Sequence, residues 1–247
     1  MDHKLIIIVP VYNAQAYIRK SLESILAQTY QNYEVCVMDD CSTDNTWRII
    51  GEVQNRHKGR MNLCRNEYRI GSALANFVKA VELFSFDVED ILVTVDGDDW
   101  LYDNSVFEYV NSVYQNPDIW MTYGQYVPAS NSYPPYCKPI PDTRTYRRSK
   151  KWLASHLRTF KRKLFNKIKD ADLRGLDGKY YPRIADCALL YPCIEMCGQA
   201  HMKFIEKILY VYNDLSSLNE MAIDGAGMRL LGNEIQSRPI YNELTKL

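Results

Sequence analysis

Three carboxylates are crowded into the four residues Asp96, Gly97, Asp98 and Asp99, directly after an apolar run at residues 91–95. Like charges this close repel one another, so the cluster is unfavourable unless a partner offsets the repulsion. A hard divalent cation with oxygen ligands is the simplest such partner. The alternative is an acidic turn with solvated side chains, because Asp and Gly are also common turn residues.

The elements that must position these carboxylates are strands and helices in alternation. Apolar runs rich in β-branched residues predict buried strands, at 5–9, 33–38, 62–65 and 91–95. The first run is expected to end at Pro10. Apolar residues at helical spacing predict helices between the strands, at 16–28, 47–53 and 72–84. Such alternation implies an α/β fold with a mostly parallel sheet and helices on both faces.

Ligands of such sheets bind at the carboxyl ends of the strands. Those ends hold residues 10–13, the pair Asp39 and Asp40, residues 66–71 and the acidic cluster. Neither a G-x-x-x-x-G-K-[ST] loop nor a G-x-G-x-x-G loop follows the first strand. At an effective dielectric near 20, two unit charges ~4 Å apart interact by about 4 kcal/mol, so an acidic pocket would repel a phosphate. A metal held by Asp98 would turn that repulsion into a bridge, which points to a metal-chelated diphosphate.

Composition narrows the class of protein. The chain has 247 residues, of which 47% are hydrophobic, enough for one full core. Its 30 basic and 30 acidic residues cancel, so global charge gives no argument for nucleic acid. No apolar run approaches the ~20 residues that span a bilayer, and the N-terminal run fits a core strand better than a secretory signal.

Seven scattered cysteines without a C-x-x-C pair favour reduced thiols in a cytosol-like compartment. A zinc site at Cys193 and Cys197 is a weaker interpretation than buried thiols. We therefore expect a cytoplasmic protein, with peripheral membrane contact and homodimer formation left open.

Three stretches in order, IIIVPVYNAQAYIRKSLESILAQTYQNYEVCVMDDCSTDNT, NEYRIGSALAN and VTVDGDDW, resemble family 2 glycosyltransferases of the GT-A fold. The resemblance is to bacterial-type enzymes of lipopolysaccharide and polysaccharide biosynthesis. It implies one Rossmann-like domain over residues 1–219, with a nucleotide-sugar-binding half at 1–105 and an acceptor-binding half at 106–219. A tail at 220–247 carries no motif.

The resemblance also implies roles for single residues. Pro10, Val11 and Tyr12 would line the nucleobase and ribose pocket, and Asp39 would accept a hydrogen bond from the base. Asp98 would bind Mn²⁺ or Mg²⁺ that bridges the diphosphate, and Asp96 would face the ribose or the metal. The implied donor site is completed by Gly71, Gly97 and Arg158. The role of Asp99 stays open between the site and the turn.

Residues 150–169 (KKWLASHLRTFKRKLFNKIK) combine apolar spacing with dense basic charge, and we expect an amphipathic helix. Its basic face would be solvated, would dock on an anionic membrane at about 1 kcal/mol per cation, or would help to neutralise the leaving diphosphate. The sequence SHLRTFKRKLF resembles a subset of the family, which singles out His156 and Arg158. The role of His201 stays open.

Asp186 precedes an apolar helical segment, at a position that matches the acidic residue presented to the acceptor in the family. An inverting transfer needs one carboxylate to take the proton of the acceptor hydroxyl, and an ordinary aspartate with a pKa near 3.9 is ionised at neutral pH. The alternative is a helix N-cap. The proline-rich residues 127–146 are either a loop that orders over a ligand or an ordinary exposed loop.

The leading hypothesis is a metal-dependent, inverting glycosyltransferase that moves a hexose from a nucleoside-diphosphate sugar, most simply a UDP sugar. Its acceptor would be a hydroxyl of a glycan, a glycolipid or a protein. One alternative is a catalytically inactive nucleotide-sugar-binding domain that acts as a partner subunit. A sugar-nucleotide pyrophosphorylase would need a glycine-rich, basic loop after the first strand, and PVYNAQ is neither.

Overall fold

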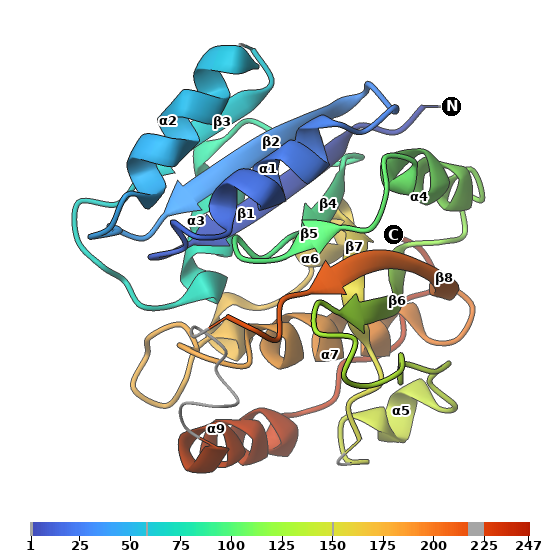
Figure 1. Ribbon diagram of the computed structural model, residues 1–247. Helices are drawn as coiled ribbons and strands as arrows, with labels where there is room; N and C mark the ends of the chain where they lie inside the picture. The colour runs from blue at the N-terminus through green and yellow to red at the C-terminus, as the bar shows by residue number, and fades with distance from the viewer. Residues whose placement is uncertain (1, 58, 150, 217–224) are drawn as a thin grey trace.

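The structure is a computed structural model that describes residues 2–57, 59–149, 151–216 and 225–247 (Figure 1). This part of the chain contains one eight-stranded sheet in the order β3-β2-β1-β4-β7-β6-β8-β5. The strands are β1 Leu5–Val11, β2 Tyr33–Asp39, β3 Met61–Arg65, β4 Ile91–Thr94, β5 Trp100–Leu101, β6 Met121–Pro128, β7 Ser155–Lys161 and β8 Met202–Tyr212. Strands β1 to β4 are parallel, as predicted, and β6 is parallel to β8. The remaining neighbours, β4 with β7, β6 with β7 and β5 with β8, are antiparallel.

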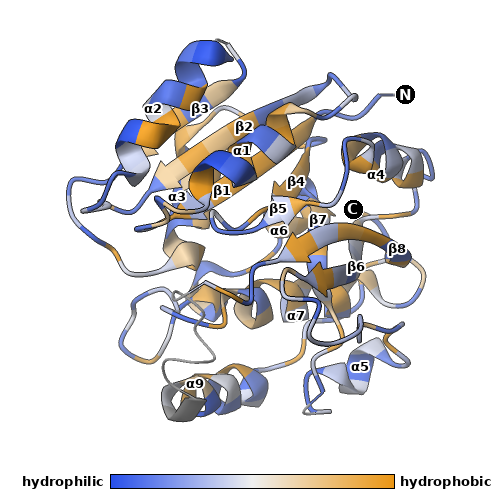
Figure 2. Cartoon of the chain, in the orientation of Figure 1, coloured by the Kyte–Doolittle hydropathy of each residue, from blue (hydrophilic) through white to orange (hydrophobic). Residues whose placement is uncertain are grey.

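Helices flank the sheet on both faces. They are α1 Ile18–Leu26, α2 Thr46–Arg56, α3 Ala73–Leu83, α4 Val106–Tyr114, α5 Thr143–Tyr146, α6 Arg162–Phe165, α7 Ala185–Cys197 and α9 Gly225–Ser237, with a 3₁₀ turn at Asp170–Leu173. Alternate residues of β1 face opposite sides of the sheet. Ile7 therefore packs into the cluster that includes α1, α2 and α4, whereas Ile8 packs into the cluster that includes α3 and α7. Figure 2 shows β1 and β2 as mostly hydrophobic, while α2 alternates between hydrophobic and hydrophilic turns.

The first strand is longer than predicted, because it continues through Pro10 to Val11. Pairing with β2 runs as far as Val11 and Asp39, whereas pairing with β4 stops at Ile8 and Thr94. Because the pairing with β4 has ended before Pro10, the missing N–H of Pro10 costs no hydrogen bond between β1 and β4. Strands β1 and β2 end together, which brings their following loops to one edge of the sheet.

The helix predicted over residues 150–169 is wrong. Residues Ser155–Lys161 form β7, all seven of them buried, with β4 on one side and β6 on the other. Of the described residues in this stretch, only Arg162–Phe165 are helical. Apolar residues three or four apart fitted the helical pattern, but pairing with two distant strands overrode it. The basic residues therefore form no single helix face: Lys161 is buried and donates to the carbonyl of Pro117 at 2.8 Å, whereas Lys167 and Lys169 are exposed.

The second half surrounds β6 and α7. Residues 129–142 form an extended connection that leads into the short helix α5, and α9 and the residues after it pack near α7. Ile235 of α9 is buried, and the backbone N–H of Leu244 donates to the carbonyl of Met196 at 2.9 Å. The predicted domain boundary at residue 219 lies outside the described residues. Among the described helices, none combines the length and the apolar character that crossing a membrane requires.

Candidate active site

The acidic turn crosses the sheet from its middle to its edge. It leaves β4, which lies beside β1, and enters β5, which pairs with β8 at the far edge. The N–H of Gly97 donates to the carbonyl of Pro10 at 3.2 Å, and a Cβ at Gly97 would lie 2.7 Å from the Cβ of Val11. Glycine at this position therefore lets the turn lie directly against the carboxyl end of β1.

Asp96, Asp99 and His156 bring their ligand atoms within 4.8 Å of one another. The Nε2 of His156, on β7, lies 3.3 Å from Asp96 Oδ2. Asp99 is 1% exposed and is held by the Tyr210 hydroxyl at 2.8 Å and the Asn213 N–H at 2.7 Å. Two carboxylates and one imidazole suit a divalent cation such as Mn²⁺, so these residues fit a metal. Of the predicted metal ligands, Asp96 belongs to this group and Asp98 does not.

Burial and neighbouring charges set the ionisation of this group. Burial raises the pKa of Asp99 well above its ordinary value, and the charges of Asp96 and Asp98 raise it further. Burial opposes ionisation of Asp96 too, but the hydrogen bond and charge of His156 and the charge of Arg158 outweigh it, so the pKa of Asp96 is lowered. Burial, and next the charge of Arg158, lower the pKa of His156. Asp99 therefore keeps a proton more readily than an ordinary aspartate does, whereas Asp96 ionises more readily.

Asp98 is not part of this group. Burial raises its pKa, against a hydrogen bond from Ser216, which follows β8. The Nδ2 of Asn213 donates to the Asp98 carbonyl at 3.1 Å. The chain after β8 therefore holds the backbone and the side chain of Asp98.

The two aspartates at the end of β2 hold neighbouring loops. Asp39 is fully buried, and it accepts from the Ser42 N–H at 3.2 Å, the Ser42 hydroxyl and Arg65 Nε at 3.1 Å. Burial raises the pKa of Asp39. Asp40 accepts from the N–H groups of Ile70 at 2.9 Å and Gly71 at 2.8 Å. Asp40 thereby fixes the loop at Gly71, whose φ of +77° favours glycine.

Tyr12 lies directly after the end of β1. It is partly exposed, and its ring carries the guanidinium of Arg69 at 3.9 Å. Such a contact is worth about 0.5–1 kcal/mol at an exposed site. The structure thus brings the predicted residues Pro10, Val11 and Tyr12 together with the Gly71 loop around the ends of β1 and β2.

Asp186 lies in the first turn of α7 and is not its N-cap, which is Ile184. Its Oδ1 accepts from the Cys187 N–H at 2.9 Å, and its Oδ2 accepts from Arg158 Nη2 at 3.3 Å. Among the described residues, Arg158 Nε is buried without a hydrogen-bond partner. A cation with an unused donor between Asp186 and Asp96 could bind an anionic group there, and Asp186 could accept a proton.

Residues from β8 were missed by the sequence analysis. Tyr210 donates to Asp99 and its ring stacks on His156 at 4.4 Å. Nothing local to residues 202–214 signals this role, because the contact joins residues more than 100 positions apart. His201 lies outside the group, where it stacks on Trp120 at 3.5 Å and contacts the carbonyl of Asp118.

Comparisons with known proteins agree with this architecture. The profile of glycosyl transferase family 2 matches residues 6–173. The glucosyltransferase WfgD of Escherichia coli, named as a UDP-Glc:alpha-D-GlcNAc-diphosphoundecaprenol beta-1,3-glucosyltransferase, is 32% identical over 131 residues, which cover 53% of this chain and 49% of that enzyme. The matches thus span only about half the length of the curated relatives.

Two solved structures share the fold. TarS of S. aureus in complex with UDP-GlcNAc superposes with a TM-score of 0.67 at 18% identity, over 96% of this chain and 68% of that one. The mannosyltransferase PcManGT of Pyrobaculum calidifontis, in complex with GDP-Man and Mn²⁺, gives a TM-score of 0.61 at 21% identity, over 90% and 60% of the two chains. Helices flank a mostly parallel central sheet, as the GT-A fold predicts.

Proposed function

This chain belongs to glycosyl transferase family 2, and from that premise we propose that it transfers a hexose from a UDP sugar to an acceptor hydroxyl, with inversion at the anomeric carbon. The observation that carries the proposal is the placement of Asp96, Asp99 and His156 beside the Arg158–Asp186 pair. The group of Asp96, Asp99 and His156 can hold a metal-bound diphosphate, and Asp186 offers a general base to the attacking hydroxyl.

Asp96, Asp99 and His156 would hold a Mn²⁺ or Mg²⁺ ion, and Asp98 would join them only if its side chain left the hydrogen bond from Ser216. When bound, the cation would neutralise the diphosphate of the donor. Arg158, with its unused Nε, lies where it can add a second positive charge toward the same anion. The cation found in the mannosyltransferase PcManGT supports this assignment.

The donor half comprises residues 1–105 in this proposal. Pro10, Val11 and Tyr12 line the nucleoside pocket, and the loop at Gly71 closes it. Asp39 contributes to nucleobase binding by positioning Ser42 and Arg65, or it accepts a hydrogen bond from the nucleobase after these two residues move away. UDP is favoured over GDP because WfgD is named for UDP-Glc and the TarS structure contains UDP-GlcNAc.

Asp186 acts on the acceptor in the half at residues 106–219. Its carboxylate takes the proton of the acceptor hydroxyl as that oxygen forms a bond to the anomeric carbon. The bond from that carbon to the diphosphate oxygen breaks, and the diphosphate leaves with the electron pair. Arg158 holds Asp186 in place at 3.3 Å. The acceptor would be a glycan, a lipid-linked sugar or a protein.

Two substitutions test the proposal. Asp186→Asn should lower kcat by about 10²–10⁴, the usual contribution of a general base, while UDP binding stays unchanged. Asp96→Asn should weaken Mn²⁺-dependent UDP binding itself. Turnover is followed as UDP release and binding by titration calorimetry, with Asp118→Asn, an exposed acid outside the site, as the control.

The competing function is a nucleotide-sugar binder without activity. Such a protein would bind UDP with Mn²⁺ but release none from any UDP sugar, with or without acceptor. Normal turnover of Asp186→Asn would instead contradict only the assignment of the base.

A further inference from the structure

Four tyrosines form a patch outside the carboxylate group, which we call the tyrosine patch: Tyr126, Tyr133, Tyr136 and Tyr212. The ring of Tyr126 lies at its centre, with centroid distances of 6.4 Å to Tyr133, 5.7 Å to Tyr136 and 5.5 Å to Tyr212. Tyr126 is only 6% exposed, whereas Tyr133 and Tyr136 are 37% and 42% exposed. Two rings therefore stand at the surface on a buried aromatic base.

The patch is continuous with the candidate active site. The Tyr126 ring meets the His156 ring edge-on at 5.7 Å, and His156 contacts Asp96 at 3.3 Å. Arg158 lies two residues after His156 on β7, so both side chains face the same side of the strand, and Arg158 pairs with Asp186 at 3.3 Å. A molecule that lies on these rings would thus lie next to His156 and close to the Arg158–Asp186 pair.

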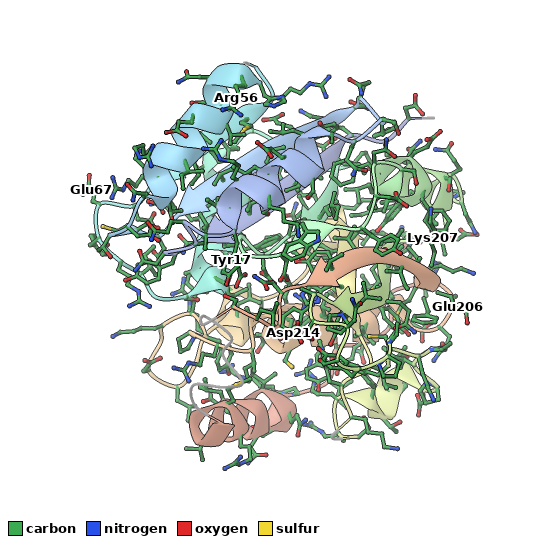
Figure 3. All side chains as sticks on the ribbon, viewed as in Figure 1. Tyr17, Arg56, Glu67, Glu206, Lys207 and Asp214 are labelled. Atoms are coloured by element: carbon green, nitrogen blue, oxygen red, sulfur yellow. The ribbon has the colours of Figure 1, made fainter. Side chains whose placement is uncertain are left out.

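The exposed rings are held in place before any ligand arrives. Tyr133 and Tyr136 flank two prolines, whose rings fix the backbone φ of the segment. On one side of it, Asp214 accepts from the Ser130 N–H at 3.0 Å and from the Ser132 hydroxyl at 3.2 Å. Asp214, labelled in Figure 3, follows the carboxyl end of β8.

On the other side of the prolines, Gln125 of β6 exchanges hydrogen bonds with Cys137, at 2.6 Å to its carbonyl and 3.1 Å from its N–H. The segment between Ser130 and Cys137 is therefore tied to β6 and to the end of β8. Preorganisation of this kind reduces the entropy lost when a ligand binds. It favours a binding surface over an ordinary exposed loop.

Rings with hydroxyl tips offer a flat apolar face and neutral hydrogen-bonding groups. A sugar ring has the matching chemistry, since one of its faces presents C–H groups and its rim presents hydroxyls. The geometry points to the tyrosine patch as a subsite for a sugar ring of the acceptor. This ring would lie next to the part of the acceptor that presents its attacking hydroxyl to Asp186. This inference rests on the proposed function and deepens it, because it makes the acceptor a glycan or a glycan-bearing lipid.

The first test measures binding without turnover. Saturation-transfer difference NMR uses the protein loaded with UDP and diamagnetic Mg²⁺, with a panel of methyl glycosides of glucose, galactose, N-acetylglucosamine and mannose. We expect transfer to the ring C–H protons of at least one glycoside, and its loss in Tyr133→Ala/Tyr136→Ala. A panel that receives no saturation from the unmodified protein overturns the inference, as does a signal that persists in the double variant.

The second test uses turnover with the glycoside that binds. Tyr136→Ala should raise the acceptor KM about tenfold, a factor that corresponds to 1.4 kcal/mol, with kcat and the donor KM unchanged. Tyr136→Phe should keep most of the affinity because it keeps the ring. The control is Tyr102→Ala, an exposed tyrosine outside the patch. An unchanged acceptor KM in Tyr136→Ala overturns the inference alone, whereas the absence of UDP release from the unmodified protein overturns the proposed function.

Discussion

Asp99 shows how the surroundings of one residue decide its chemistry. It is one of three aspartates in four residues, and only its burial under Tyr210 and Asn213 separates it from the other two. The spacing of the three aspartates alone leaves the role of Asp99 open for that reason. Asp99 and His156 complete the group with Asp96 because β7 and β8 fold onto the turn, and no spacing within residues 96–99 could reveal this.

The raised pKa of Asp99 leads to a prediction on pH. A cation must displace the proton that the folded protein holds there, so Mn²⁺ affinity should rise with pH until the folded pKa is passed. Without metal, the folded state binds that proton more tightly than the unfolded chain, so stability at this site is highest below the unfolded pKa near 3.9 and is lost as pH rises through the folded pKa. Calorimetric Mn²⁺ titration over about pH 5–8 measures the first effect.

Two controls accompany this titration. Asp99→Asn should make Mn²⁺ binding weaker and should reduce its dependence on pH. Comparing buffers of different ionisation enthalpy counts the protons released. If the unmodified protein releases none across the range, Asp99 is not a proton-bearing ligand.

Whether a strand could be predicted from the sequence depended on its neighbours. Strands β1 and β2 carry continuous apolar runs because the parallel half of the sheet is covered on both faces, and such runs stand out in any sequence. Strand β7 does not, because its buried His156 and Arg158 point to partners in the site rather than to solvent. Polar residues that a site requires thus masked the strand that presents them.

The acidic turn gives a prediction for an element. Gly97→Ala should destabilise the protein by about 1–3 kcal/mol, because the new Cβ overlaps the Val11 side chain and forces the turn away from β1. Gly51→Ala is the matched control. It lies in α2 with open space around its Cβ and should stabilise the protein by about 0.5–1 kcal/mol. Urea unfolding gives both values, and equal effects would show that the close approach at Gly97 is not a constraint.

At the scale of the whole molecule, one buried ion pair joins α5, α7 and the segment after α9. Arg147 and Glu195, 2% and 1% exposed, form two hydrogen bonds of 2.6 Å, and Arg147 also donates to the Ile235 carbonyl at 3.3 Å. The N–H of Tyr241 donates to the same Glu195 at 3.0 Å. No local pattern signals this pair, since its members lie 48 residues apart, and residues 220–247 were expected only as a tail without a motif.

Removing one member of this pair should be costly. Glu195→Ala would leave Arg147 buried without its counter-ion, and we expect a loss of about 3–5 kcal/mol in the free energy of unfolding. Glu89→Ala breaks the exposed pair with Lys163 and should cost less than about 1 kcal/mol. Denaturant titration of both variants measures the difference. A small effect at Glu195 would mean that water reaches Arg147 readily.

The acidic turn starts beside β1, contacts β7 through Asp96 and contacts β8 through Asp99. A cation bound by Asp96, Asp99 and His156 would therefore cross-link the acidic turn with β7 and, through Asp99, with β8, although β6 separates β7 from β8 in the sheet. Deuterium uptake should report it. With Mn²⁺ at 100 times its Kd, backbone amides at the carboxyl end of β8 should exchange up to about 100-fold more slowly. Amides of β3, at the opposite edge of the sheet, should keep their exchange rates when they exchange by local opening that leaves the cation site intact.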